Sequence, residues 1–281
     1  MRPTRSDPFS SPGLLPGRLN WPGKSLVFTL AFGAAGSLLV LFVLLPLVST
    51  LLAVTPSALI QVLTDPQVQA SLRLTFGAAA AATGLAALGG IPLAYILARR
   101  RFPGKRLVEA IVDLPVVIPH TAAGIALLMV FGSRGLLGKP LAGIGLYFTN
   151  NALGVIIAML FVSLPYLVNL SREAFGLVDE ELERIALVEG ATEWQAFTQV
   201  TLPLAWRGVF SGALMMWARG ISEFGAVVIL AYHPKIIPVL IYERFQGFGL
   251  SVALPVAALL IFTALAVFTL LRLVLLPEIK D

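Results

Sequence analysis

Residues 179–203 read DEELERIALVEGATEWQAFTQVTLP and form the longest polar interval after the first 25 residues. Strongly apolar stretches flank this segment at 152–171 and 206–231. The acidic run that begins at Asp179 favours a helix start, because carboxylates are stabilised at the positive end of the helix dipole. Gly190 stands where a glycine commonly ends a helix. The segment is therefore predicted to open with one short helix.

A second short helix is expected to follow directly. Thr192 and Gln195 have the spacing of a capping box, in which each side chain satisfies an exposed backbone N–H near the other. The apolar residues that follow fall on one stripe of a helix. Pro203 is expected to end this helix near Leu202, because a residue before proline avoids the helical conformation. The segment is thus predicted as two short amphipathic helices hinged at Gly190.

The charge of residues 179–203 indicates what this helix pair binds. Six carboxylates stand against one arginine, a net charge of −5. A helix pair that lies in lipid headgroups is expected to carry a basic face, and an acidic face opposite anionic lipid is unfavourable. A protein partner is therefore the preferred interpretation, with the headgroup position as the alternative.

The chain as a whole is strongly apolar. Of 281 residues, 58% are hydrophobic and only 12% are charged, against about 25% charged in soluble domains. A membrane helix needs about 20 mostly apolar residues. Six stretches qualify: 26–52, 71–98, 111–131, 152–171, 206–231 and 251–276. We predict an all-α fold.

The predicted architecture is a polytopic membrane bundle of six transmembrane helices in a single domain, residues 26–276. A Pro-rich leader, residues 1–25, precedes this domain, and a short tail, residues 277–281, follows it. The side of the bilayer that would hold both termini and residues 179–203 carries 14 of the 20 Lys and Arg, and the other side carries 5. Because Lys and Arg concentrate in cytoplasmic loops, both termini are predicted to be cytoplasmic.

Two opposite charges lie within the fifth predicted span. Arg219 falls near its middle, where a lone arginine costs about 2.5–3.5 kcal/mol on insertion scales. Glu223 follows four residues later and so shares a helix face with Arg219. The pair is interpreted either as a structural ion pair or as a pore-lining pair at a gate. Ionisable groups inside the membrane mark function more often than not, so the gate is preferred.

The third predicted span begins irregularly. Pro115 and Pro119 lie four residues apart, and irregular backbone at membrane depth must be buried in protein or line a cavity. This makes the segment, together with His120, a candidate for the transport pathway. Glu109 and Asp113 share a face nearby and are interpreted as acids at a helix N-terminus.

Several kinds of chemistry are excluded or unsupported by the residues. The chain has no cysteine, so it has neither a thiol nucleophile nor a thiolate metal site. Two histidines cannot form a His-rich metal cluster. Residues 17–25, GRLNWPGKS, have five residues between the glycines where a P-loop has four. No catalytic residue, metal or bound cofactor is expected, and the chain is predicted not to be an enzyme. A secondary transporter remains an alternative, although the matching halves typical of that class are not visible.

Residues 179–203 resemble the cytoplasmic loop of ABC-importer permeases, which reads Glu-Ala-Ala, three residues, Gly, nine residues and Ile-x-Leu-Pro. Two positions depart from this pattern: Arg184 stands at the Glu, with Glu183 directly before it, and Ile185 stands at the first Ala. In the family this loop docks on the ATPase subunit. The resemblance implies that role for Glu183, Arg184, Ile185, Ala186, Gly190, Ala191, Leu202 and Pro203.

Two further stretches resemble the molybdate, tungstate and sulfate permeases of this family. They are residues 113–124, DLPVVIPHTAAG, and residues 218–226, ARGISEFGA. The resemblance is greater to the molybdate/tungstate branch than to the sulfate branch, and it does not decide which oxyanion is carried. It implies that the pore or gate includes Arg219, Glu223, Phe224, Gly225, Pro115, Pro119 and His120.

The resemblance also implies partners and a location. We expect a homodimer with two ABC ATPase subunits and an extracytoplasmic oxyanion-binding protein, in the plasma membrane of a prokaryote and without nucleic acid. ATP and Mg would be bound by the ATPase partner and not by this chain. The expected function is therefore that of a translocation pore that an ATPase subunit drives.

Overall fold

The structure is a computed structural model that describes residues 26–275, with side chains described up to residue 271. The chain divides into two compact units, residues 1–49 and 50–281, and each is described by itself. Within the described residues every regular element is a helix, which confirms the all-α prediction. The predicted leader, the predicted tail and the last residue of the sixth predicted span lie outside the described residues.

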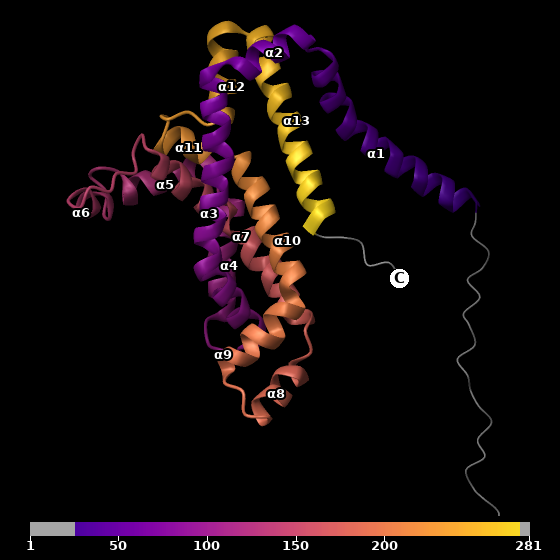
Figure 1. Cartoon of the computed structure of the whole chain (residues 1–281), viewed down its shortest axis with the longest axis vertical. Coiled ribbons are helices and arrows are strands. Elements are labelled where there is room, and N and C mark those ends of the chain that lie inside the picture. The colour runs from indigo at the N-terminus through magenta and orange to yellow at the C-terminus, as the bar shows by residue number, and fades with distance from the viewer. Residues whose placement is uncertain (1–25, 276–281) are drawn as a thin grey trace, which may run out of the picture. The chain divides into compact units, whose positions relative to one another are not determined.

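The first helix, α1 (Leu26–Leu52), is long and apolar enough to cross a membrane. The other helices, shown in Figure 1, are α2 (Pro56–Thr64), α3 (Pro66–Arg99), α4 (Lys105–Val117), α5 (His120–Phe131), α6 (Gly138–Ala142), α7 (Ala152–Leu177), α8 (Glu180–Val188), α9 (Glu193–Ala196), the π-turn (Phe197–Thr201), α10 (Leu202–Ile221), α11 (Gly225–Leu230), α12 (Ile237–Phe248) and α13 (Leu250–Leu275).

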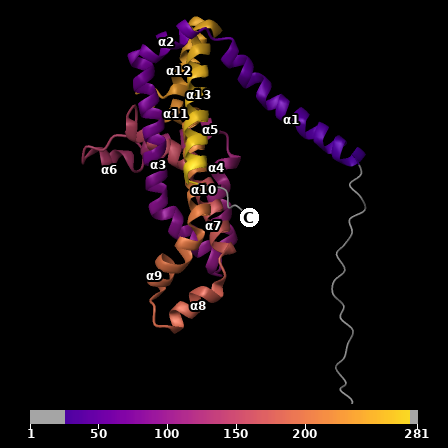
Figure 2. The ribbon, with the colours of Figure 1, turned by 45° about the vertical axis from the view of Figure 1, so that its right-hand side comes forward.

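The centre of the second unit is built from α3, α7 and α10, which lie side by side in both views (Figures 1 and 2). Small residues bring these helices together. A side chain on Gly208 of α10 would overlap the Cβ of Ala174 on α7, and Gly212 lies directly against Leu167. Close backbone approach of this kind is how helices associate where lipid supplies no hydrophobic drive. The three helices form a bundle, with α8 and α9 at one end and α2 and α12 at the other (Figure 1).

The predicted count of six spans is not confirmed. Four described helices are long and apolar enough to cross a membrane: α1, α3, α7 and α13. The third predicted span is broken into α4 and α5, which are bent by 114° and bring the count to five at most. Ile118, before Pro119, is extended, as steric clash with the proline ring requires. The fifth predicted span is broken as well, because α10 ends at Ile221 and α11 begins at Gly225.

The predicted helix end at Leu202 is wrong. The chain passes from α9 through the π-turn into α10, and the Leu202 N–H donates to the Phe197 carbonyl five residues back. Pro203 thus falls in the first turn of α10. A proline is tolerated in a first turn, where its missing N–H is not needed. The widened turn therefore lets one helical path connect the α8–α9 loop to the centre of the bundle.

Candidate functional site: the α8–α9 loop and the Arg219 cluster

The first short helix of the loop begins and ends where the sequence predicts, and the second begins where it predicts. The Asp179 carboxylate accepts the Glu181 N–H at 3.0 Å and caps α8. Gly190 has a φ of +94°, and the N–H groups of Gly190 and Ala191 donate to carbonyls of the last turn. This pair of bonds is a Schellman motif, which needs a left-handed residue at the glycine position. The capping box of Thr192 and Gln195 is present.

The loop carries apolar side chains that face away from the bundle. Ile185 is 53% exposed and Trp194 is 71% exposed. Arg184 is also exposed and pairs with Glu180 at 3.3 Å within α8. Several exposed large apolar side chains beside charged ones are typical of a protein-binding site. The large apolar residues of this face are Leu182, Ile185, Leu187, Val188 and Trp194, and we call them the loop face.

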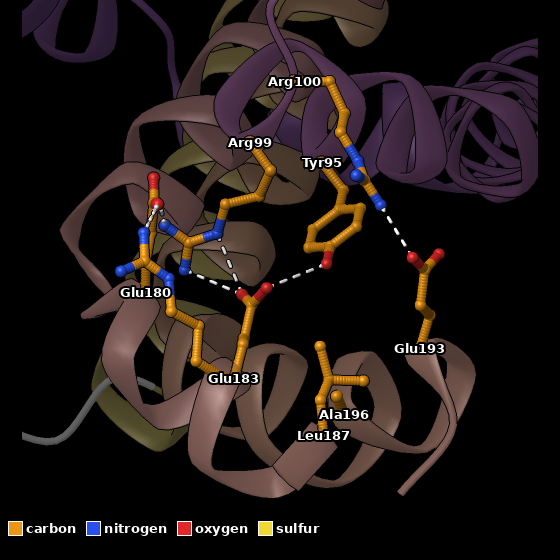
Figure 3. A pocket seen from close by; sticks show the side chains of 9 residues that line it. Tyr95, Arg99, Arg100, Glu180, Glu183, Leu187, Glu193 and Ala196 are labelled. Atoms are coloured by element: carbon orange, nitrogen blue, oxygen red, sulfur yellow. Dashed lines mark hydrogen bonds and ion pairs between the residues drawn. The ribbon is translucent and has the colours of Figure 1, made fainter.

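Glu183 differs from its neighbours because its side chain turns inward and is only 14% exposed. Figure 3 shows its carboxylate between Arg99 and Tyr95 of α3. Arg99 reaches one carboxylate oxygen through Nε and Nη2, each at 2.9 Å. The same oxygen accepts from Thr201 Oγ1 at 2.6 Å, and the other accepts from the Tyr95 hydroxyl at 3.0 Å. Glu183 and its α3 partners line a small hollow of about 170 Å³.

The second candidate site is a cluster of polar groups around Glu223, whose side chain is fully buried. Arg219 Nη2 donates to Glu223 Oε2 at 2.9 Å, so the two side chains form the predicted ion pair. The other carboxylate oxygen accepts the Ala226 N–H at 2.9 Å. His120 Nδ1 lies 2.9 Å from Glu223 Oε2, and Arg219 Nη2 lies 2.8 Å from the same ring nitrogen. We call Arg219, Glu223 and His120 the Arg219 cluster.

The Arg219 cluster lies where two helix breaks meet. His120 is the first residue of α5, after the break at Pro119, and Glu223 lies in the break between α10 and α11. A Cβ on Gly225 would lie 2.8 Å from the Cβ of His120, so this glycine permits the contact of α5 with α11. The Phe224 ring packs on Tyr242 of α12, with centroids 5.0 Å apart.

The contacts of Glu109 and Asp113 differ from those predicted for acids at a helix N-terminus. The helix α4 starts at Lys105, so Asp113 lies more than two turns inside it. Both side chains bind α7: Glu109 pairs with Arg172 at 2.9 Å, and Asp113 accepts from Asn169 Nδ2 at 2.6 Å. These contacts hold α4, which contains the buried Pro115, against the centre of the bundle.

Sequence reasoning missed Tyr95, Arg99 and Thr201 as partners of the loop, because nothing local marks them. Arg99 follows an apolar stretch and is one of the basic residues from which the orientation is predicted. Among the described residues, no group of three His, Asp or Glu side chains is placed to hold a metal ion.

Comparison with known proteins places this arrangement in a family. Residues 90–278 match the family described as the inner membrane component of binding-protein-dependent transport systems. The chain belongs to this family. The match covers α4 to α13 and therefore both candidate sites. Members are membrane components of transport systems and not enzymes, which agrees with the prediction from the residues.

Individual relatives support this permease assignment. The chain is 43% identical over 244 residues to the molybdate/tungstate transport system permease protein of Pyrococcus furiosus, which covers 86% of this chain and 93% of that one. It is 32% identical over 245 residues to the sulfate transport system permease protein of Escherichia coli K12, covering 85% and 88%. A bacterial alginate ABC transporter, solved with a periplasmic protein, matches the fold with a TM-score of 0.67 at 17% identity, covering 90% and 96%.

Proposed function

We propose that this chain is the pore-forming permease subunit of an ATP-driven importer for molybdate or tungstate. The observation that carries the proposal is the acidic α8–α9 loop, which presents an exposed apolar face at one end of a membrane bundle. A secondary transporter or an intramembrane enzyme has no need of such a surface.

The loop face would dock on a separate ATPase subunit, which supplies ATP and Mg. Its exposed apolar side chains would enter a groove of the ATPase, and the surrounding carboxylates would meet basic residues there. Arg184, Ile185, Ala186, Gly190 and Ala191 would form the contact region. Leu202 and Pro203 would carry motion into α10, because they open that helix directly after the π-turn.

The Arg219 cluster would form the gate. Ionisable groups inside a membrane bundle line pathways or pair with one another, and the pairing of Arg219 with Glu223 supports a role inside the bundle. Two broken helices bring irregular backbone to the cluster, which at membrane depth must be buried in protein or line a cavity. Pro119, Phe224 and Gly225 lie at these breaks and would change conformation when the gate opens.

The choice of molybdate or tungstate rests on relatives. The Pyrococcus relative is named for molybdate and tungstate at 43% identity, whereas the sulfate permease of Escherichia coli is at 32%. Sulfate is the second candidate for the same reason. All three are tetrahedral dianions, so an arginine that is released from its carboxylate partner suits each of them.

The assembly we propose is a homodimer of this chain with two ATPase subunits and an extracytoplasmic oxyanion-binding protein. It would lie in the plasma membrane of a prokaryote, with the loop face and both termini in the cytoplasm. The distribution of Lys and Arg supports this orientation, and the alginate transporter solved with its periplasmic protein supports the class of partner.

Docking of the loop face can be tested by co-purification with the ATPase subunit. Val188→Glu places a charge on the exposed apolar face and touches no buried residue, because Val188 is 86% exposed. The variant should insert and fold but lose the ATPase during purification. Ile144→Glu is a matched control, since Ile144 is 72% exposed and lies in the turn after α6, away from the loop face. If Val188→Glu retains the ATPase as the wild type does, the loop face is not the docking surface.

A further inference from the structure

We propose that Glu183 is a positioning residue that fastens α8 to α3 and α10, and that it is not a contact to the ATPase. Motion of the docked loop would then reach the bundle through this carboxylate as well as along the chain at Leu202 and Pro203. The inference rests on the proposed function and adds the route by which docking and the gate are connected. This role differs from the docking role that the resemblance to ABC-importer permeases implies for Glu183.

The hydrogen bonds of Glu183 support this role first. An ionised carboxylate offers about four lone-pair sites. Four donor groups approach Glu183: Nε and Nη2 of Arg99, the Tyr95 hydroxyl and the Thr201 hydroxyl. All four belong to this chain, and none belongs to α8 itself. Three of these donors meet on Oε1 and one reaches Oε2. Because only 14% of the side chain is exposed, the carboxylate is directed to partners within this chain and away from another subunit.

Arg99 attaches α3 to α8 at two points. Its side chain is only 6% exposed, and Nη2 also donates to the Val178 carbonyl at 2.8 Å, directly before α8. Arg99 therefore holds both the start and the middle of α8 from the last turn of α3. Removing one partner of a buried pair costs far more than breaking an exposed one, because the remaining charge stays buried without compensation. The contact is thus expected to persist while the loop moves.

A cluster of three aromatic rings lies behind the carboxylate and joins the same elements. The Tyr95 ring is 4.8 Å from the Phe197 ring and 5.7 Å from the Phe175 ring, measured between centroids. The Phe175 and Phe197 rings are 5.9 Å apart. These rings come from α3, α7 and the π-turn, so packed aromatic side chains lie next to the Glu183 carboxylate. Packed cores move between discrete arrangements and do not deform continuously.

Thr201 connects Glu183 with the Arg219 cluster. It is fully buried at the end of the π-turn, and α10 then continues without a break from Leu202 to Ile221. At about 1.5 Å per residue, the path from Thr201 to Arg219 is about 27 Å of helix. Displacement of Glu183 would thus act on one end of a rigid helix whose other end carries the gate residue.

A second ion pair between the end of α3 and the loop provides a contrast. Arg100 pairs with Glu193 at 3.0 Å, but the two side chains are 59% and 77% exposed. Exposed pairs contribute little to stability because water screens them and their side chains lose entropy. Glu193→Gln therefore makes the same chemical change as Glu183→Gln, at the same junction, without removing a buried attachment.

The test measures tungstate uptake and ATP hydrolysis together, in proteoliposomes that contain the full complex of permease, ATPase and binding protein. Glu183→Gln and Arg99→Gln should co-purify with the ATPase and hydrolyse ATP. Their uptake per ATP hydrolysed should fall by about fivefold or more, as expected when a coupling free energy of the usual size is lost. The double variant should be no worse than the worse single variant. Glu193→Gln should keep the wild-type ratio.

Other results would overturn the inference. Loss of the ATPase from Glu183→Gln, with an unchanged uptake-to-hydrolysis ratio in what remains, would make Glu183 a docking contact. If Glu183→Gln does not assemble, Tyr95→Phe decides, because it keeps the aromatic ring and removes one donor; a wild-type ratio there contradicts the proposal. A wild-type complex that takes up no oxyanion would contradict the proposed function itself, whereas unchanged ratios in an active complex contradict only this inference.

Discussion

Arg219 donates a hydrogen bond of 2.9 Å to Glu223, and the carboxylate that receives it is fully buried. The two residues are one turn apart in sequence, but they lie on either side of the end of α10. Their contact therefore connects α10 to the residues that follow its end, and it is not a contact along one face of a continuous helix. His120 adds a third polar group from the break before α5.

Removal of either charge from this pair should damage the protein, and removal of both should damage it less than the sum. Arg219→Met and Glu223→Gln each leave a buried polar or charged partner uncompensated, at a cost of about 3–5 kcal/mol in soluble proteins. The double variant should recover assembly because no orphan charge remains. Size-exclusion profiles in detergent and uptake assays measure both effects. Arg207→Met, an exposed change at the other end of α10, is the control.

The double variant also separates a structural role from a gate. Assembly without transport, or an anion leak without ATP, places the pair at the gate. Recovery of both assembly and uptake makes the pair structural only. Strictly additive damage would mean that the two residues do not interact.

Gly190→Pro should detach the ATPase and leave insertion intact. Proline fixes φ near −65° and has no N–H, whereas Gly190 has a φ of +94° and donates to the Leu187 carbonyl. The hinge between α8 and α9 cannot form with proline. Gly145→Pro is a matched control, because Gly145 also has a positive φ of 83° but lies in the turn after α6. ATPase co-purification distinguishes the two, and retention by Gly190→Pro would contradict the docking account.

The predicted orientation can be read by labelling single cysteines, since the native chain has none. Lys139→Cys, after α5, should react with an impermeant thiol reagent added outside whole cells. Arg106→Cys, in the first turn of α4, should react only after the cells are opened. Both native side chains are exposed, so burial does not confuse the comparison. The reverse pattern of labelling would place the loop face outside the cell.

Asp65 should stabilise the opposite end of the bundle in a pH-dependent manner. Burial opposes its ionisation, but hydrogen bonds from Arg244 and from the first amides of α3 hold the pKa of Asp65 below its usual value of 3.8. The Arg244 bond is 2.6 Å long. A lowered pKa contributes stability above pH 3.8, and that contribution is lost as the pH falls through the lower folded-state pKa.

Thermal unfolding in detergent tests this account of Asp65. At pH 7, Asp65→Asn should be less stable than the wild type by about 1–3 kcal/mol, the usual contribution of a charge-assisted hydrogen bond. The difference should shrink as the pH is lowered below 3.8. A difference that is constant with pH would mean that the charge of Asp65 contributes nothing.

The sequence predicts the local features of this protein better than its long-range contacts. The caps at Asp179 and Thr192 and the left-handed Gly190 depend on neighbouring residues, and all three are present. The partners of Glu183 and Asp113 lie on other helices, 84 and 56 residues away in the case of Arg99 and Asn169. No periodicity brings such residues together, so their contacts appear only once α3, α4 and α7 are packed.

The predicted membrane spans also separate into features that depend on local sequence and features that depend on long-range contacts. The uninterrupted helices α1, α3, α7 and α13 were expected from apolar length alone. The irregular start of the third span was expected from Pro115 and Pro119. The break near Glu223 was not, because no proline stands there. Side-chain contacts across the break, from Arg219 and from the Ala226 N–H, stabilise that conformation. Breaks of this kind depend on tertiary partners that hydropathy does not report.

The most direct test of the central claim is uptake of labelled tungstate by proteoliposomes that contain this chain, its ATPase and its binding protein. We expect uptake that requires ATP and all three components. Unlabelled molybdate should compete strongly with labelled tungstate, and sulfate should compete weakly. Uptake that persists without the ATPase and follows an ion gradient instead would contradict the account and make the chain a secondary transporter.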